Sequence, residues 1–114
     1  MSKRLSWLIR PIAHRGLHDA ARGVVENSST AFAHAIEAGY GIECDVRLCA
    51  GGEVVVFHDE TLDRLTLSTG PVAAKTPAEL KAVAFRQGSD RIQTLGELLE
   101  QVCGQVPLVI ELKS

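Results

Sequence analysis

Residues 28–48, SSTAFAHAIEAGYGIECDVRL, place a predicted helix directly before a predicted strand. Asn27 or Ser28 is suited to cap the start of the helix, and Gly39 is suited to end it. The strand that follows, residues 41–48, carries an apolar body with charged side chains at intervals. A capped helix joined to a strand by a short turn is typical of α/β proteins. The buried face of the helix is predicted to hold Ala31, Phe32, Ala35 and Ile36.

The same alternation continues on both sides of this segment. Predicted strands occupy residues 9–14, 53–58 and 107–113, and capping boxes at residues 76–79 and 94–97 begin two more helices. Strands that alternate with helices indicate an α/β protein with a largely parallel sheet. The strand at 53–58 is apolar on both faces, which suits a parallel strand, but it follows the preceding strand too closely for a parallel crossover. Either one connection is irregular or this pair of strands is antiparallel.

The composition is that of an ordinary globular chain. The 114 residues are 46% hydrophobic and carry a net charge of −2, which allows one modest core, and we expect a single domain over residues 1–114. There is no basic excess and only 4% of residues are aromatic, which argues against nucleic-acid binding. Residues 1–10 are too short and too interrupted for a secretion signal, and no stretch is long enough to span a bilayer, so we expect a cytoplasmic protein. The cysteines are expected to be small buried side chains in a reducing compartment: Cys44, Cys49 and Cys103.

Charged residues form two pairs on single faces of the predicted strands. Side chains alternate across a strand, so Glu43 and Asp45 point the same way, and so do Glu111 and Lys113. In parallel β/α proteins, ligands bind at the C-terminal ends of the strands. Carboxylates that converge there repel one another unless a divalent cation relieves the repulsion, and an all-oxygen set favours magnesium or calcium over zinc. The alternative for Glu111 and Lys113 is a salt bridge at the rim of the sheet.

Two histidines also end predicted strands, His14 the first and His58 the third. Either histidine alone would more simply be a residue with structural hydrogen bonds, as we expect of His18 and His34. Their joint position at strand ends, beside the carboxylates, indicates a pair of groups for general acid and base catalysis.

Five short motifs occur in an order and spacing that resemble the glycerophosphodiester phosphodiesterase family. They are His14-Arg15-Gly16, Glu26-Asn27-Ser28, Glu43-Cys44-Asp45-Val46, His58-Asp59 with Leu62-Asp63-Arg64, and Glu111-Leu112-Lys113. The resemblance implies an α/β fold of the TIM-like (β/α)8 type. A full barrel takes about 250 residues, so this chain would form the first half of one, completed either by dimerisation or by further C-terminal sequence.

The resemblance also implies an activity, which is the hydrolysis of glycerophosphodiesters to an alcohol and glycerol 3-phosphate with a divalent metal cation. The catalytic histidines of the family fall on His14 and His58, and the sequence leaves open which is the acid and which the base. The arginine that contacts phosphate falls on Arg15, and the strand-end lysine falls on Lys113. The metal-binding carboxylates of the family fall on Glu43, Asp45 and Glu111.

Two other functions remain open at this point. A half-length chain can be an inactive binding module that keeps the metal site, or a phospholipase C-like lyase that stops at a cyclic phosphate. A half barrel also leaves its outer strands unpaired, and exposed strand edges invite pairing with another chain. We therefore expect a homodimer through the open edges if no further sequence completes the barrel.

Overall fold

The structure is a computed structural model and describes residues 10–113. The expectations on the start of the first strand and on a secretion signal therefore lie wholly or largely outside the described residues. Within this range there is no helix long and apolar enough to cross a membrane. The elements are β1 (Ile12–His14), η1 (Ala20–Arg22), α2 (Ser29–Ala38), β2 (Gly41–Leu48), η2 (Ala50–Gly52), β3 (Val54–Val56), η3 (Val72–Ala74), α3 (Pro77–Lys81), α4 (Leu95–Val102) and β4 (Leu108–Leu112).

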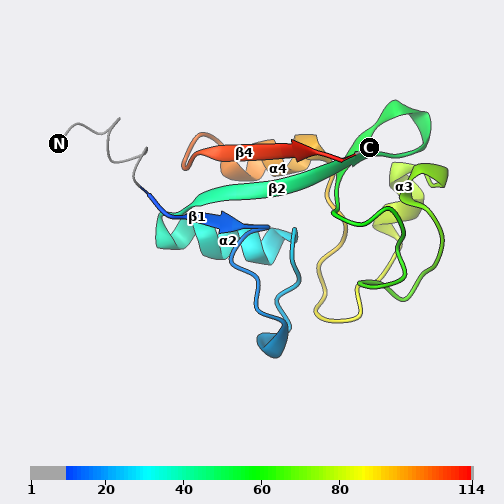
Figure 1. Cartoon of the computed structure of the whole chain (residues 1–114), viewed down its shortest axis with the longest axis horizontal. Coiled ribbons are helices and arrows are strands. Elements are labelled where there is room, and N and C mark those ends of the chain that lie inside the picture. The colour runs from blue at the N-terminus through cyan, green and yellow to red at the C-terminus, as the bar shows by residue number, and fades with distance from the viewer. Residues whose placement is uncertain (1–9, 114) are drawn as a thin grey trace.

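Strand β2 is the centre of the sheet (Figure 1). β1 pairs with residues 41–43 of β2, and β4 pairs with residues 42–46 on the other side, both in parallel. β3 pairs with the last residues of β2 in the antiparallel direction. The sheet is therefore largely parallel, as predicted, and of the two alternatives for the third strand the antiparallel one is correct.

The antiparallel direction of β3 follows from the short turn before it. Gly51 and Gly52 both adopt positive φ angles, 86° and 79°, which residues with a Cβ rarely adopt. The chain reverses here within a few residues, so β3 runs back along β2 instead of crossing over a helix.

Local capping chemistry fixes the helix ends. Ser28 caps α2 by accepting from the backbone N–H of Ala31, and Gly39 ends it in the left-handed region. Both predicted capping boxes are present at the starts of α3 and α4. α4 ends with its C-cap Cys103, which takes the left-handed conformation (φ 45°) one residue before Gly104.

Cys103 is also exposed, so the expected burial is wrong for this cysteine and confirmed for Cys44 and Cys49.

The apolar residues form two separate cores. The sheet core lies between the sheet and helices α2 and α4, which cover one face of it (Figure 1). The second core holds together the segment that follows β3 and carries α3, and we refer to residues 59–93 as the inserted segment. The sheet core consists of Ala13, Phe32, Ala35, Ile42, Cys44, Val46, Val56, Leu98, Val102 and Val106. The second core consists of Val25, Cys49, Val55, Phe57, Leu62, Val72, Leu80, Val83, Phe85 and Ile92.

Strand β4 forms an open edge of the sheet. In the described part of the chain it pairs with β2 only. Its apolar side chains Val109, Ile110 and Leu112 are exposed, although a parallel strand is normally covered on both faces. The same holds for Ile12 on β1, at the other edge. The three parallel strands thus form one sector of a barrel with uncovered edges.

Candidate active site

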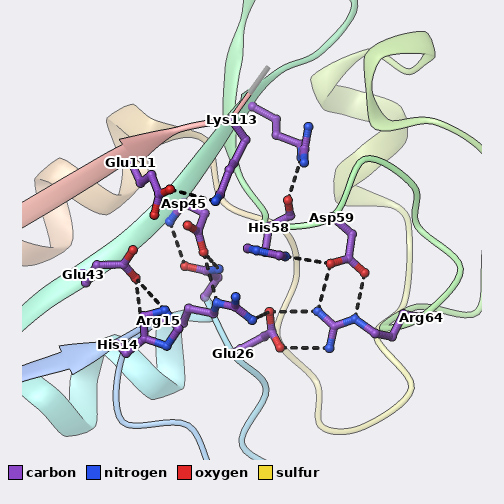
Figure 2. A network of polar contacts seen from close by, with 12 residues as sticks. His14, Arg15, Glu26, Glu43, Asp45, His58, Asp59, Arg64, Glu111 and Lys113 are labelled. Atoms are coloured by element: carbon purple, nitrogen blue, oxygen red, sulfur yellow. Dashed lines mark hydrogen bonds and ion pairs between the residues drawn. The ribbon is translucent and has the colours of Figure 1, made fainter.

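Three carboxylates meet on the sheet face that the helices leave open. Glu43 and Asp45 come from β2, and Glu111 comes from β4, where it is the direct parallel partner of Asp45. One oxygen from each lies within 4.8 Å of the others, so the structure brings the three predicted metal ligands together (Figure 2). Asp45 is 1% exposed, whereas Glu111 is open to solvent.

Asn27 orients the buried Asp45. Its amide Nδ2 donates to Asp45 Oδ2 (3.1 Å), and its Oδ1 accepts from the backbone N–H of Asp45 (3.2 Å). Asn27 has a φ of 55°, a conformation that asparagine tolerates better than most residues. The backbone N–H of Asn27 also donates to the carbonyl of Arg15 (2.9 Å). The loop between β1 and α2 is thereby tied to the carboxylate cluster.

Arg15 lies against the same carboxylates. Its backbone N–H donates to Glu43 Oε1 (3.1 Å), and its guanidinium donates from Nη1 to Glu26 Oε2 (3.0 Å). Its Nε lies 3.3 Å from Asp45 Oδ2 but is not aligned for a hydrogen bond, so this contact is an ion pair only. The left-handed backbone of Arg15 (φ 58°) turns the chain toward the strand ends.

The two predicted histidines reach the site by different routes. His14 ends β1, and its Nε2 lies 3.8 Å from Glu43 Oε1 with most of the ring exposed. His58 does not end its strand as predicted, because β3 ends at Val56. It follows the antiparallel β3, where Phe57 N–H donates to the carbonyl of Asp45 (3.0 Å), and this turn returns the chain to the level of the cluster.

His58 has a defined partner. Its Nδ1 lies 2.8 Å from Asp59 Oδ1, and Figure 2 shows the other ring nitrogen on the side of the carboxylate cluster. Hydrogen bonds from Arg64 lower the pKa of Asp59 to about 2, so Asp59 is an anion and can only accept. Nδ1 of His58 is therefore the protonated nitrogen, and Nε2 is free to exchange a proton with a ligand.

Lys113 pairs with Glu111. Its Nζ donates to Glu111 Oε1 (2.8 Å), and its backbone N–H donates to the carbonyl of Val46 at the end of β2 (2.9 Å). The hydrogen bond and charge of Lys113 hold the pKa of Glu111 below its usual value. The salt bridge that the sequence offered as an alternative is thus present within the carboxylate cluster.

Four polar residues near the site were not among the site residues predicted from the sequence. Glu26, Arg64 and Asp59 connect Arg15 with His58 (Figure 2). Asn27 is bonded to Asp45. Burial tends to raise the pKa of Glu26, but the hydrogen bonds of Arg64 and the charges of Arg64 and Arg15 hold it below its usual value. The only signal in the sequence was that all four lie inside the motifs that carry the family resemblance.

Comparison with known proteins identifies the family. The model of the Glycerophosphoryl diester phosphodiesterase family matches residues 14–113. The chain belongs to this family. The prediction made from the five motifs is confirmed, and two curated relatives of the chain are named glycerophosphodiester phosphodiesterases, which are phosphoric diester hydrolases.

Two curated relatives show how much of the family domain is present. The chain is 42% identical to a glycerophosphodiester phosphodiesterase of Caldanaerobacter subterraneus subsp. tengcongensis, over 90% of this chain and 44% of the relative. It is 37% identical to a glycerophosphodiester phosphodiesterase of Bacillus altitudinis, over 89% of this chain and 43% of the relative. The chain thus spans less than half the length of these curated phosphodiesterases.

Solved structures of the phosphodiesterase family agree with the fold. A glycerophosphodiester phosphodiesterase from Agrobacterium tumefaciens matches with a TM-score of 0.81 at 37% identity, covering 92% of this chain and 47% of that one. A phosphodiesterase from Oleispira antarctica, solved in complex with the product sn-glycerol-3-phosphate, matches with a TM-score of 0.81 at 33% identity, covering 96% and 46%. These neighbours are TIM barrels, so the predicted partial barrel is confirmed.

Proposed function

We propose that this site hydrolyses glycerophosphodiesters to an alcohol and glycerol 3-phosphate with the help of a divalent cation. The observation that carries the proposal is the convergence of Glu43, Asp45 and Glu111 within 4.8 Å, beside an arginine and two imidazoles. The named activity of the relatives and the product bound to the Oleispira antarctica enzyme support the same substrate class.

The donor set suits a hard cation. All three groups offer carboxylate oxygens, which magnesium and calcium prefer. The hydrogen bonds described above use one oxygen of each carboxylate, Oε1 of Glu43, Oδ2 of Asp45 and Oε1 of Glu111, and leave the second to a cation. A bound cation would neutralise negative charge on the phosphodiester and polarise its phosphoryl oxygen.

The protein can supply further positive charge to the phosphodiester. The guanidinium of Arg15 is a planar donor suited to phosphate oxygens, and it lies beside Asp45 on the open face of the sheet. Lys113 lies on the opposite side of the cluster, next to Glu111. An anionic substrate placed at the cation is thus flanked by two basic side chains.

The two histidines can share the proton transfers. One imidazole takes a proton from the attacking hydroxyl, and the other gives a proton to the leaving alkoxide. In His58 the free nitrogen is Nε2, because Nδ1 is committed to Asp59. The attacking group in this proposal is either the neighbouring glycerol hydroxyl of the substrate, which forms a cyclic phosphate, or water.

The experiment is a hydrolysis assay with glycerophosphocholine, with magnesium, calcium and manganese tested in turn and phosphorus NMR as the readout. We expect glycerol phosphate as the product, loss of turnover on chelation, and a loss of about 100-fold or more in His58→Gln. His34→Gln is the matched control, because His34 is exposed on α2. Cyclic phosphate as the end product would favour the lyase. Metal binding without turnover would favour the inactive module.

The oligomeric state of the chain must be measured under the conditions of the assay. We propose that copies of this chain associate through the open edges of the barrel sector when no further sequence covers them, because β4 exposes apolar side chains on both faces.

A further inference from the structure

Arg64 lies in the middle of the chain of contacts that runs from Arg15 to His58. Its Nε donates to Asp59 Oδ2 (2.7 Å) and its Nη2 to Asp59 Oδ1 (3.0 Å). Its Nη1 donates to Glu26 Oε1 and its Nη2 to Glu26 Oε2, both at 3.0 Å. One guanidinium therefore makes a two-point contact with each of two carboxylates, an arrangement that the single ammonium of lysine does not reproduce.

Each of these carboxylates holds one residue of the proposed site. Asp59 fixes Nδ1 of His58 at 2.8 Å, and Glu26 accepts from Nη1 of Arg15 at 3.0 Å. Arg64 thereby lies one residue away from the proposed acid/base group and from the proposed phosphate ligand. Arg15 and His58 are thus connected through Arg64, although Arg15 lies after β1 and His58 lies after β3.

The backbone under Arg64 is itself well fixed. Leu62 is fully buried, and its carbonyl accepts from both the hydroxyl (2.7 Å) and the backbone N–H (3.1 Å) of Thr66. The carbonyl of Asp63 accepts from Nη2 of Arg86 (2.9 Å). The side chain of Arg64 therefore starts from a rigid turn of the inserted segment.

We infer that Arg64 is a positioning residue that sets the orientation of His58 and Arg15 through Asp59 and Glu26. All four of its hydrogen bonds go to the two carboxylates that hold His58 and Arg15, so they fix the positions of these two residues in addition to any effect on stability. The inserted segment would then contribute to the reaction by aligning Arg15, which follows β1, and His58, which lies after β3.

The first test reads the ring of His58 directly and needs no activity. Nitrogen-15 NMR at about pH 9, above the usual imidazole pKa, is recorded on the full chain, and His58→Gln assigns the ring signals. We expect the Nδ1-protonated form in the unmodified chain and a mixture of both neutral forms in Arg64→Lys and Arg64→Ala. Arg22→Lys is the control, because Arg22 pairs with Asp19 on the surface far along the loop. An unchanged His58 signal in both folded Arg64 variants overturns the inference.

The second test is kinetic and rests on the proposed function. We expect kcat to fall by about 10- to 100-fold in Arg64→Lys with a smaller change in KM, and we expect ethylguanidinium to restore part of the loss in Arg64→Ala. Arg64→Lys keeps the test decisive if the alanine variant does not fold. If the unmodified chain shows no turnover, the proposed function fails for this chain, while the NMR result still decides the role of Arg64. Equal kcat in the unmodified chain and Arg64→Lys contradicts the inference.

Discussion

Asp45 is the residue on which the carboxylate cluster depends most. It is buried, and Asn27 forms one hydrogen bond with its carboxylate and one with its backbone N–H. Asp45→Asn keeps the shape and removes the charge, so we expect it to abolish cation binding. In the unmodified chain, a cation at 100 times its Kd should raise the free energy of unfolding by about 2.7 kcal/mol. Thermal unfolding with and without magnesium or calcium measures this. Glu37→Gln on the exposed face of α2 is the control, and an equal rise in Asp45→Asn would contradict the metal site.

The lowered pKa of Asp59 predicts how the free energy of unfolding depends on pH. Its pKa in the folded chain is about 2, mainly through the hydrogen bonds of Arg64, below the usual value for aspartate of about 3.9. A lowered pKa contributes stability that is present above about pH 5 and is lost as the pH falls toward 2. Asp59→Asn should therefore be less stable than the unmodified chain near neutral pH, and the difference should shrink in acid. Urea unfolding across this range measures it, and a constant difference would refute the assignment.

The candidate residues could be found in the sequence, but the contacts between them could not. Alternation along a strand was enough to predict that Glu43 and Asp45 share a face, and the structure confirms this geometry. The bond between Glu26 and Arg64 joins residues 38 positions apart in irregular segments. No periodicity describes such segments, so their partners follow only from the tertiary fold.

At the scale of elements, the packing of the loop that carries Arg15 onto α2 depends on Gly16. A Cβ at Gly16 would lie 2.9 Å from both the backbone carbon and the Cβ of Ala31, and φ is 78°. Gly23 has a similar φ of 74°, but apart from its chain neighbours no atom lies within 4 Å of its added Cβ. We expect Gly23→Ala to cost about 1 kcal/mol, from backbone strain alone, and Gly16→Ala to cost more than about 2 kcal/mol because of the clash. Urea unfolding compares the two, and equal losses would show that the contact with α2 is unimportant.

The residues at which helices begin were easier to predict than the direction in which a strand runs. The caps at Ser28, Thr76 and Thr94 are local hydrogen bonds between residues three apart, so the sequence contains all the information needed. The direction of β3 is different, because an apolar run looks the same in a parallel and in an antiparallel strand. The length of the glycine turn was the useful signal, and it narrowed the choice to two arrangements.

At the scale of the whole molecule, the open edge at β4 predicts self-association. Leu112 is 70% exposed on this edge, and Leu67, in the inserted segment, is 69% exposed away from it. We expect light scattering to give twice the chain mass for the unmodified chain and for Leu67→Lys, and the mass of a single chain for Leu112→Lys. A single-chain mass for the unmodified chain would mean that the edge stays uncovered without a second copy.

The division of the apolar residues into two cores has a consequence for how the proposed site is assembled during folding. His14 directly follows Ala13 of the sheet core, and His58 directly follows Phe57 of the second core. The two imidazoles therefore come together only when both cores are folded. A chain with one folded core would hold only one of the two in place. The activity proposed for this site would therefore be lost when either core unfolds.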